Sequence, residues 1–200
     1  MLIKMHYFTN NIDGKSDEFE FSEVILGEKF RFVSDIGVFS KGELDIGSRL
    51  LIESFDESEV SGDVLDVGCG YGPIGLSLAR LLPDSVVHMV DVNLRALGLT
   101  KKGAELNGVS NVRVYESFCY DGVDGKFGAI LSNPPIRAGK KIVHQIIEQS
   151  IDYLEDNGSF WVVIGKKQGA PSAQAKMMDV YGNCELVVRK KGFWILKSRK

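Results

Sequence analysis

The segment from Val64 to Gly75 places the strongest constraint on the fold. Val64–Val67 is a short apolar run, and three glycines follow it at alternate positions: Gly68, Gly70 and Gly72. Pro73 then opens an apolar stretch with helical spacing, and proline suits the first turn of a helix. Glycines at such a turn let the backbone bend sharply and let a ligand approach main-chain atoms. The segment therefore predicts a buried strand, a tight turn and a helix.

The rest of the chain alternates between strand-like and helical runs. We expect core strands at 64–67, 86–92, 112–115, 127–131 and 160–164, and helices at 74–82, 94–106, 142–154 and 173–180. Asn157-Gly158 is expected to close the helix over 142–154. This alternation favours an α/β fold, with a mostly parallel sheet covered by helices on both faces. Two last strands, 186–189 and 193–197, are joined by only three residues, so they must be antiparallel. The prediction is a Rossmann-like seven-stranded sheet that ends in an antiparallel hairpin.

The first forty residues have a different pattern. Apolar and polar residues alternate over 19–24 and 29–33 with Gly27 between them, which predicts a β-hairpin. A helical pattern follows over 44–55. We therefore divide the chain into a small β-rich head, 1–40, and an α/β domain, 41–200.

Composition excludes several classes of protein. The 200 residues carry a formal net charge of −3, with 44% hydrophobic and 26% charged residues, which is an ordinary globular balance. The three cysteines form no C-x-x-C pair or Cys/His cluster, so we expect neither a disulfide framework nor a metal site. No apolar run approaches the length of a membrane span, and we expect a cytoplasmic protein. The acidity argues against a globally basic nucleic-acid binder but allows a local basic patch.

An acidic residue completes a candidate nucleoside site. Asp91 ends the second core strand about 20 residues after the glycine turn, where a carboxylate can bind both ribose hydroxyls. Gly70–Gly75 also satisfies the dinucleotide fingerprint G-x-G-x-x-G. However, Asp66 would repel a pyrophosphate and attract an ammonium group, and Pro73 has no N–H to donate to a phosphate. These residues favour S-adenosylmethionine over NAD.

A second motif points to the chemistry. Ser132-Asn133-Pro134-Pro135 follows the fourth core strand, at the same edge of the sheet. The prolines make the turn rigid, and the Asn133 side-chain oxygen with an adjacent main-chain carbonyl can accept both hydrogens of an –NH2 group. Such a turn would aim the lone pair of an exocyclic amine at a sulfonium methyl group, a reaction catalysed mainly by positioning and electrostatics. We predict that Asn133, Pro134 and Pro135 form a catalytic turn.

Together these motifs resemble class I S-adenosylmethionine-dependent methyltransferases, and more narrowly the small methyltransferase domain family, which includes ribosomal RNA guanine 2-amino methyltransferases. The resemblance rests on four blocks: Phe39–Glu53, Asp66–Gly75, Val90–Asn93 and Ser132–Lys140. It implies that 41–200 is the methyltransferase domain. It also implies cofactor contacts from the glycine turn and its acids, and from the block 41–48: Asp66, Gly68, Gly70, Gly72, Asp91, Asn93, Asp45 and Gly47.

The chain departs from the family pattern at several positions. Ile136 stands where an aromatic residue often stacks on the target base, so we assign stacking to Phe39, Tyr71 or Arg137. Phe118 stands where a polar residue often reads the adenine, and we expect it to pack on the adenine ring. Gly128 stands where the strand often carries an acid.

Basic residues near the predicted edge are candidates for substrate binding. We expect Arg137, Lys140 and Lys166 to contact RNA phosphates, with Phe39 near the target base. A further basic group near the C-terminus is interpreted as a solvated tail: Arg189, Lys190, Lys191, Lys197, Arg199 and Lys200.

The hypothesis from the sequence is methyl transfer from S-adenosylmethionine to the 2-amino group of a guanine in ribosomal RNA, with 16S rRNA as the first choice. The expected partner is ribosomal RNA or a partly assembled ribosomal subunit, with no membrane and no metal. One alternative keeps the fold but changes the acceptor to a protein glutamine amide or a DNA adenine amine. Another is a catalytically silent nucleoside-binding module.

Overall fold

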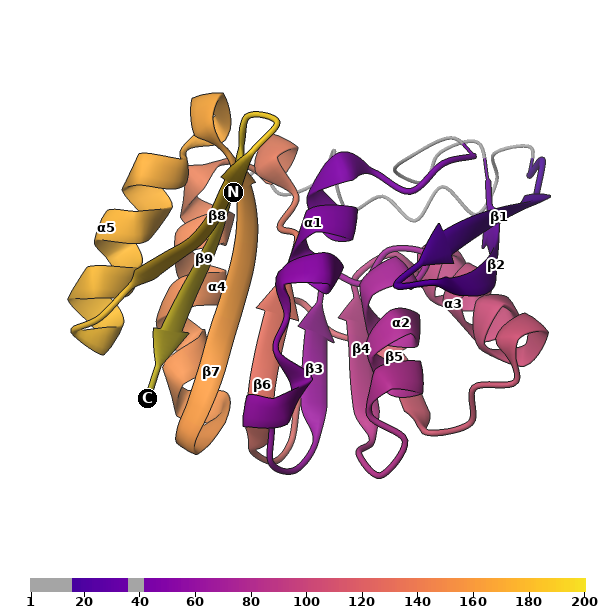
Figure 1. The fold of residues 1–200 in the computed structure, drawn as a ribbon, viewed down its shortest axis with the longest axis horizontal. Coiled ribbons are helices and arrows are strands. Elements are labelled where there is room, and N and C mark those ends of the chain that lie inside the picture. Colours follow the sequence, from indigo (N-terminus) through magenta and orange to yellow (C-terminus); the bar gives the residue numbers. More distant parts are fainter. Residues whose placement is uncertain (1–15, 36–41) are drawn as a thin grey trace.

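A computed structural model describes residues 16–35 and 42–200, with only the backbone of Arg137. It contains a seven-stranded sheet with helices on both faces and a separate hairpin packed at one side (Figure 1). The strands of the main sheet are β3 (Val64–Val67), β4 (Val87–Asp91), β5 (Val112–Glu116), β6 (Phe127–Ser132), β7 (Leu154–Gly165), β8 (Glu185–Lys190) and β9 (Phe193–Arg199).

The strand order is β5-β4-β3-β6-β7-β9-β8. Strands β3 to β7 are parallel to one another, whereas β9 is antiparallel to both β7 and β8. The predicted architecture, a mostly parallel sheet that ends in an antiparallel hairpin, is therefore confirmed. The order also places β6 beside β3, so the turns that follow these two strands meet at the same edge.

Helices cover both faces of this sheet. They are α1 (Ile46–Ser54), α2 (Pro73–Leu81), α3 (Leu94–Asn107), α4 (Lys140–Tyr153) and α5 (Ala170–Tyr181), with short 3-10 helices η1 (Glu57–Glu59), η2 (Ile136–Ala138) and η3 (Lys166–Gln168). Side chains of β7 alternate between two cores. Trp161 and Val163 belong to the core that includes residues of α1 to α3, while Val162 and Ile164 belong to the core of α4 and α5. None of the described helices is long and apolar enough to cross a membrane.

The head forms the predicted hairpin, with β1 (Phe19–Ile25) paired to β2 (Glu28–Ser34). Its turn has positive φ at both central residues, 52° at Leu26 and 83° at Gly27, which is the pattern of a type I′ turn. Phe30 and Phe32 are buried in the same core as α1 to α3, so the hairpin is anchored to the α/β layers. The division of the chain at residue 40 stays a prediction, because it falls among residues 36–41, outside the described part.

One predicted boundary is wrong. We expected Asn157-Gly158 to close the fourth predicted helix, but α4 ends at Tyr153, and Leu154 already pairs with Phe127. Asn157, at a φ of 66°, lies inside β7 where the register with β6 shifts. The asparagine-glycine pair therefore forms an irregularity within a strand. Such irregularities, like helix ends, accommodate residues with left-handed backbone.

Candidate active site

The carboxyl ends of β4, β3 and β6 bring the predicted motifs together. Asp66 lies in β3, Asp91 ends β4, and Asn133 follows β6 directly. The end of β6 is tied to the end of β3 by Ser132, whose Oγ donates to the Val67 carbonyl at 2.8 Å. The predicted catalytic turn thus lies next to the glycine turn.

The glycines of this turn have two different roles. Gly68 and Gly70 have φ angles of 78° and 58°, and no described atom would lie within 4 Å of a Cβ at either position. In contrast, a Cβ at Gly72 would lie 2.9 Å from Thr100 Cγ2, and one at Gly75 would lie 2.5 Å from Met89 Cε. Gly68 and Gly70 therefore leave open space beside the backbone. The close packing around the start of α2 explains why a glycine stands at position 72. The predicted contact of Gly72 with the cofactor stays a prediction.

Asp91 connects the glycine turn to the start of α3. Its Oδ2 accepts from Gly70 N and its Oδ1 from Asn93 N, each at 2.9 Å. Asn93 in turn caps α3 by accepting from Arg95 N and Ala96 N. Burial raises the pKa of Asp91 above its ordinary value. Each carboxylate oxygen keeps a further lone pair, so Asp91 can still accept from ribose hydroxyls.

Asp66 is wholly buried beneath the turn. Its Oδ2 accepts from Gly75 N at 2.9 Å, whereas its Oδ1 has no hydrogen-bond partner within the described residues. Burial, reinforced by the charge of Asp91, raises the pKa of Asp66 to about 7. A buried acceptor without a partner has a high energetic cost unless a ligand satisfies it. The cationic groups of S-adenosylmethionine fit this acceptor and the open space beside Gly68 and Gly70.

The Asn133 side chain is held by two residues at the start of α1. Its Nδ2 donates to Ser48 Oγ at 2.9 Å and to Asp45 Oδ1 at 3.2 Å. Asp45 is itself fixed as the N-cap of α1, accepting from Ser48 N at 3.0 Å. Because both of these bonds use the amide nitrogen, the amide oxygen remains available to accept a hydrogen bond. Pro134 is buried and Pro135 half-buried, so the turn is well supported.

Ser48 is a site residue that our sequence analysis did not single out. The only local signal was its place three residues after Asp45, a spacing typical of a helix start. The cofactor contacts predicted for Asp45 and Gly47 stay predictions. Packing explains Gly47 as well, because a Cβ there would lie 3.3 Å from Phe193 Cε1. Phe118 follows β5 and is half-buried against the α4–α5 core, and its contact with adenine also stays a prediction.

The structure excludes one candidate stacking residue, Tyr71, and explains one family departure, Gly128. Tyr71 is only 3% exposed and packs edge-on against Phe21 and Phe32 of the hairpin, with both centroid distances 5.7 Å. The expectation that Tyr71 could stack on a target base is therefore wrong, because the head covers it. At Gly128 a Cβ would lie 1.7 Å from the Ser61 carbonyl oxygen, so no side chain fits there. Phe39 lies outside the described residues.

The basic residues separate into two groups. Lys140 begins α4 and Lys166 begins η3, and both are exposed at the edge of the sheet that carries Asn133. Arg137 is placed in η2 by its backbone. The six C-terminal cations do not form one tail, because Lys197 and Arg199 both pair with Glu59 near the opposite edge. Substrate contacts of Arg137, Lys140 and Lys166 stay predictions.

The chain is similar to known proteins over most of its length. The chain is 51% identical over 197 residues to YbxB of Bacillus subtilis, an uncharacterised protein, with 98% of each chain covered. It is 40% identical over 131 residues to ribosomal RNA small subunit methyltransferase C of Aeromonas hydrophila, covering 64% of this chain and 37% of that protein. The chain spans about half or less of the length of the curated ribosomal RNA methyltransferases that it matches.

A solved structure shows the same fold. The Thermus thermophilus 16S rRNA N2 G1207 methyltransferase, in complex with AdoMet and guanosine, superposes with a TM-score of 0.82 at 25% identity. The superposition covers 93% of this chain and 51% of that one. Residues 29–197 match the methyltransferase small domain. The chain therefore belongs to the methyltransferase small domain family, and it is an S-adenosylmethionine-dependent methyltransferase.

Proposed function

We propose that this protein transfers a methyl group from S-adenosylmethionine to the exocyclic 2-amino group of a guanine in small-subunit ribosomal RNA. The observation that carries the proposal is the fixed orientation of Asn133. Its amide nitrogen is bound to Ser48 and Asp45, which leaves the amide oxygen to accept from a substrate. A rigid acceptor at the end of β6 suits an amine whose two hydrogens must both be held.

The residues of the turn have defined roles in this proposal. The Asn133 Oδ1 and the Pro134 carbonyl accept the two hydrogens of the guanine amine and direct its lone pair toward the glycine turn. S-adenosylmethionine, when bound, supplies an electrophilic methyl group. The new carbon–nitrogen bond forms as the carbon–sulfur bond breaks, and the amine proton leaves to solvent afterwards, so no strong base is needed. Prolines at 134 and 135 keep N–H donors out of the turn.

The cofactor residues act mainly as a preformed support. We propose that Asp91 accepts from the ribose hydroxyls, that Gly68 and Gly70 allow close approach, and that Asp66 provides negative charge beneath the methionine end. The bonds from Asp91 to Gly70 N and from Asp66 to Gly75 N hold the turn in place before any ligand binds. Such preorganisation limits the ordering that binding must impose.

The guanine acceptor is supported by likeness to a relative rather than by a contact in this chain. The Thermus thermophilus protein is named as an N2 methyltransferase of 16S rRNA and was solved with guanosine. The likeness covers 93% of this chain and 51% of that protein. A base inside a duplex could not reach the Asn133 turn, so we propose that the target is flipped out or single-stranded.

Transfer of a labelled methyl group tests this proposal. The purified protein is incubated with labelled S-adenosylmethionine and, separately, with small ribosomal subunits, deproteinised 16S rRNA, ribosomal proteins and DNA. We expect label in RNA, and mass analysis of its nucleosides should show N2-methylguanosine. Label in a protein glutamine or in DNA adenine would show that the acceptor is that group and not guanine. Absence of cofactor binding in calorimetry would favour a catalytically silent module.

A further inference from the structure

We infer that six lysines at one half of the carboxyl edge form a track for the RNA phosphates that flank the target nucleotide. This inference rests on the proposed function and adds the path of the substrate. The lysine rim, as we name it, consists of Lys140, Lys141, Lys166, Lys167, Lys190 and Lys191. Four of its members, Lys141, Lys167, Lys190 and Lys191, were not substrate-binding candidates from the sequence.

Strand register brings the rim together from distant parts of the chain. Gly165, the last residue of β7, pairs with Phe193 of β9, and Phe193 pairs with Lys190, the last residue of β8. The Lys166 N–H donates to the Gly192 carbonyl at 2.7 Å. In Figure 1 the yellow turn between β8 and β9 accordingly stands at the upper end of β7. Lysines 190 and 191 therefore lie beside lysines 166 and 167.

The rim begins next to the catalytic turn. Ser132, the residue before Asn133, pairs with Val162 of β7, and Lys140 and Lys141 open α4 just after the turn. From β6 the order continues through β7 and β9 to β8. Three steps of about 4.8 Å between strands span about 14 Å. The rim thus extends outward from Asn133, on the side away from the cofactor strands β3 and β4.

These lysines are exposed and electrostatically available. All six are exposed, and none forms an ion pair with another described residue. Many other cations are already paired, among them Arg49 with Glu23 and Lys197 with Glu59. Arg189, next to the rim, lies over the Trp194 ring at 5.3 Å. A row of unpaired lysines suits a polyanion with regularly spaced charges, and RNA is the polyanion that this site would meet.

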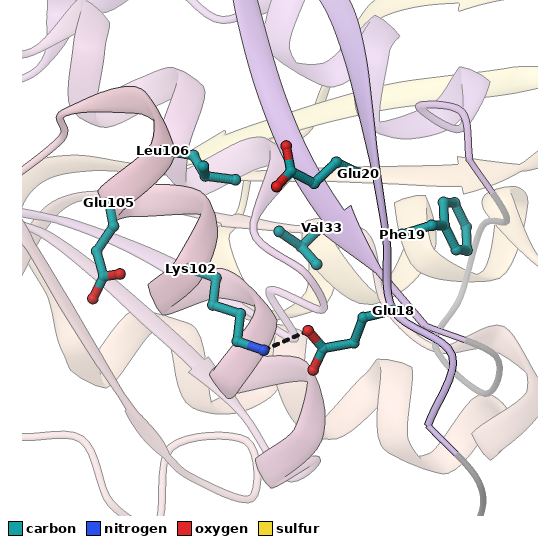
Figure 2. A pocket seen from close by; sticks show the side chains of 7 residues that line it. All are labelled: Glu18, Phe19, Glu20, Val33, Lys102, Glu105 and Leu106. Carbon is teal, nitrogen blue, oxygen red and sulfur yellow. Dashed lines mark hydrogen bonds and ion pairs between the residues drawn. The ribbon is translucent and has the colours of Figure 1, made fainter.

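A cavity beside the hairpin offers a contrast. It measures about 400 Å³ and lies between the hairpin and α3 (Figure 2). Three glutamates line it, Glu18, Glu20 and Glu105, and its one cation, Lys102, is paired with Glu18. Carboxylates repel phosphate, so this cavity does not suit an RNA strand. The lysine rim is the surface whose charge agrees with the substrate.

Neutralising the turn between β8 and β9 tests the rim. The variant is Lys190→Gln/Lys191→Gln, and the matched control is Lys29→Gln/Lys101→Gln, which makes the same charge change at two exposed lysines on β2 and α3. Binding of a mixed-sequence single-stranded RNA and of deproteinised 16S rRNA is measured by fluorescence anisotropy over a series of KCl concentrations. Losing two phosphate contacts should reduce the slope of log affinity against log salt by about 1.4.

We expect the rim variant to bind RNA about tenfold more weakly at low salt, with the control within about threefold of wild type. In methyl transfer, the KM for RNA should rise with kcat unchanged. Calorimetry with S-adenosylmethionine should give wild-type affinity and so verify folding. Equal losses of RNA affinity in both variants, or an unchanged salt slope in the rim variant, would contradict the role of the lysine rim in RNA binding.

The outcome separates the two proposals. If wild-type protein methylates guanine in rRNA and the rim variant keeps its KM, the rim is wrong and the proposed function stands. If wild-type protein neither binds nor methylates RNA, both proposals are wrong. If binding weakens in the rim variant only, the rim is supported independently of which guanine is modified.

Discussion

The carboxyl edge of the sheet has two halves that differ in charge and in exposure. At β3, β4 and β5 it carries Asp66, Asp91 and Glu116. Asp66 is buried and Asp91 half-buried, and both are hydrogen-bonded to backbone amides. At β6, β7, β9 and β8 it carries the exposed lysine rim. One half suits a cofactor with cationic groups and the other an anionic RNA. A formal net charge of −3 conceals this separation, because it sums both halves.

The difference in exposure has a consequence for function. The buried Asp66 and the half-buried Asp91, fixed by Gly75 N and Gly70 N, are screened little by salt and need little reorganisation to bind a ligand. Exposed lysines on long flexible side chains are screened by salt and adapt to many RNA shapes. We therefore expect cofactor affinity to depend weakly on ionic strength and RNA affinity to depend strongly on it. Asn133 lies where the two halves meet.

The largest expected effect concerns this meeting point. Asn133→Ala removes the acceptor for the amine but touches neither Asp66 nor Asp91. We expect kcat for methyl transfer to fall by about 10²–10³, as for loss of one aligned electrostatic group. Cofactor affinity in calorimetry and the salt slope of RNA binding should stay at wild-type values.

Asn183→Ala serves as the control for Asn133→Ala. Asn183 bonds Arg199 near the opposite edge, so its loss should not affect transfer. Full activity of Asn133→Ala would contradict the role of the catalytic turn.

A smaller effect is expected from the residue that orients Asn133. Ser48→Ala removes the 2.9 Å bond to Asn133 Nδ2 but leaves the asparagine in place. A net hydrogen bond is worth about 1 kcal/mol, so kcat should fall about five- to tenfold while the KM for RNA stays constant. Steady-state kinetics with 16S rRNA measures this separation of kcat from KM.

Ser54→Ala is the matched control on the same helix. The Ser54 Oγ donates to the Leu50 carbonyl, within α1 and away from Asn133. If both serine variants lose the same activity, the effect of Ser48 comes from helix stability and its positioning role is wrong.

The acidic half should also show a pH dependence. The folded-state pKa of Asp66 is raised from 3.8 to about 7, so the fold favours the protonated group. Stability is then fully present below the unfolded pKa and declines as pH rises from about 4 to about 7. Binding of a cationic cofactor favours the ionised group, so affinity should rise over pH 6–8 with release of protons. Thermal unfolding and calorimetry in buffers of different ionisation enthalpy measure both trends.

Asp66→Asn should flatten both trends, because the amide does not titrate. Asp91 has a pKa raised in the same direction, so a small residual slope is expected. A wild-type affinity for S-adenosylmethionine that stays constant over pH 6–8 would contradict a role for the Asp66 charge in binding.

Local patterns in the sequence were enough to predict most of the fold and to place the two main motifs of the candidate site at one edge of the sheet. The type and order of the core strands and helices follow from apolar periodicity, and Asp91 and Asn133 were placed together because parallel strands end at one edge. The contact of Ser48 with Asn133, the burial of Tyr71 and the clash at Gly128 depend on how distant segments pack. The split among the C-terminal cations depends on the register of β8 and β9. No local pattern encodes these long-range relations.

The smallest expected effect tests whether the charge of the rim is specific. Arg199 lies in β9 and pairs with Glu59, with 43% of its side chain exposed. Because exposed ion pairs contribute little, Arg199→Gln should change the free energy of unfolding by less than about 1 kcal/mol in urea titrations. The salt slope of RNA binding should remain unchanged, since Arg199 is at the opposite end of β9 from the rim. A slope reduced as much as in the Lys190→Gln/Lys191→Gln variant would mean that RNA responds to total charge, and the contrast between the two halves of the edge would then lose its functional meaning.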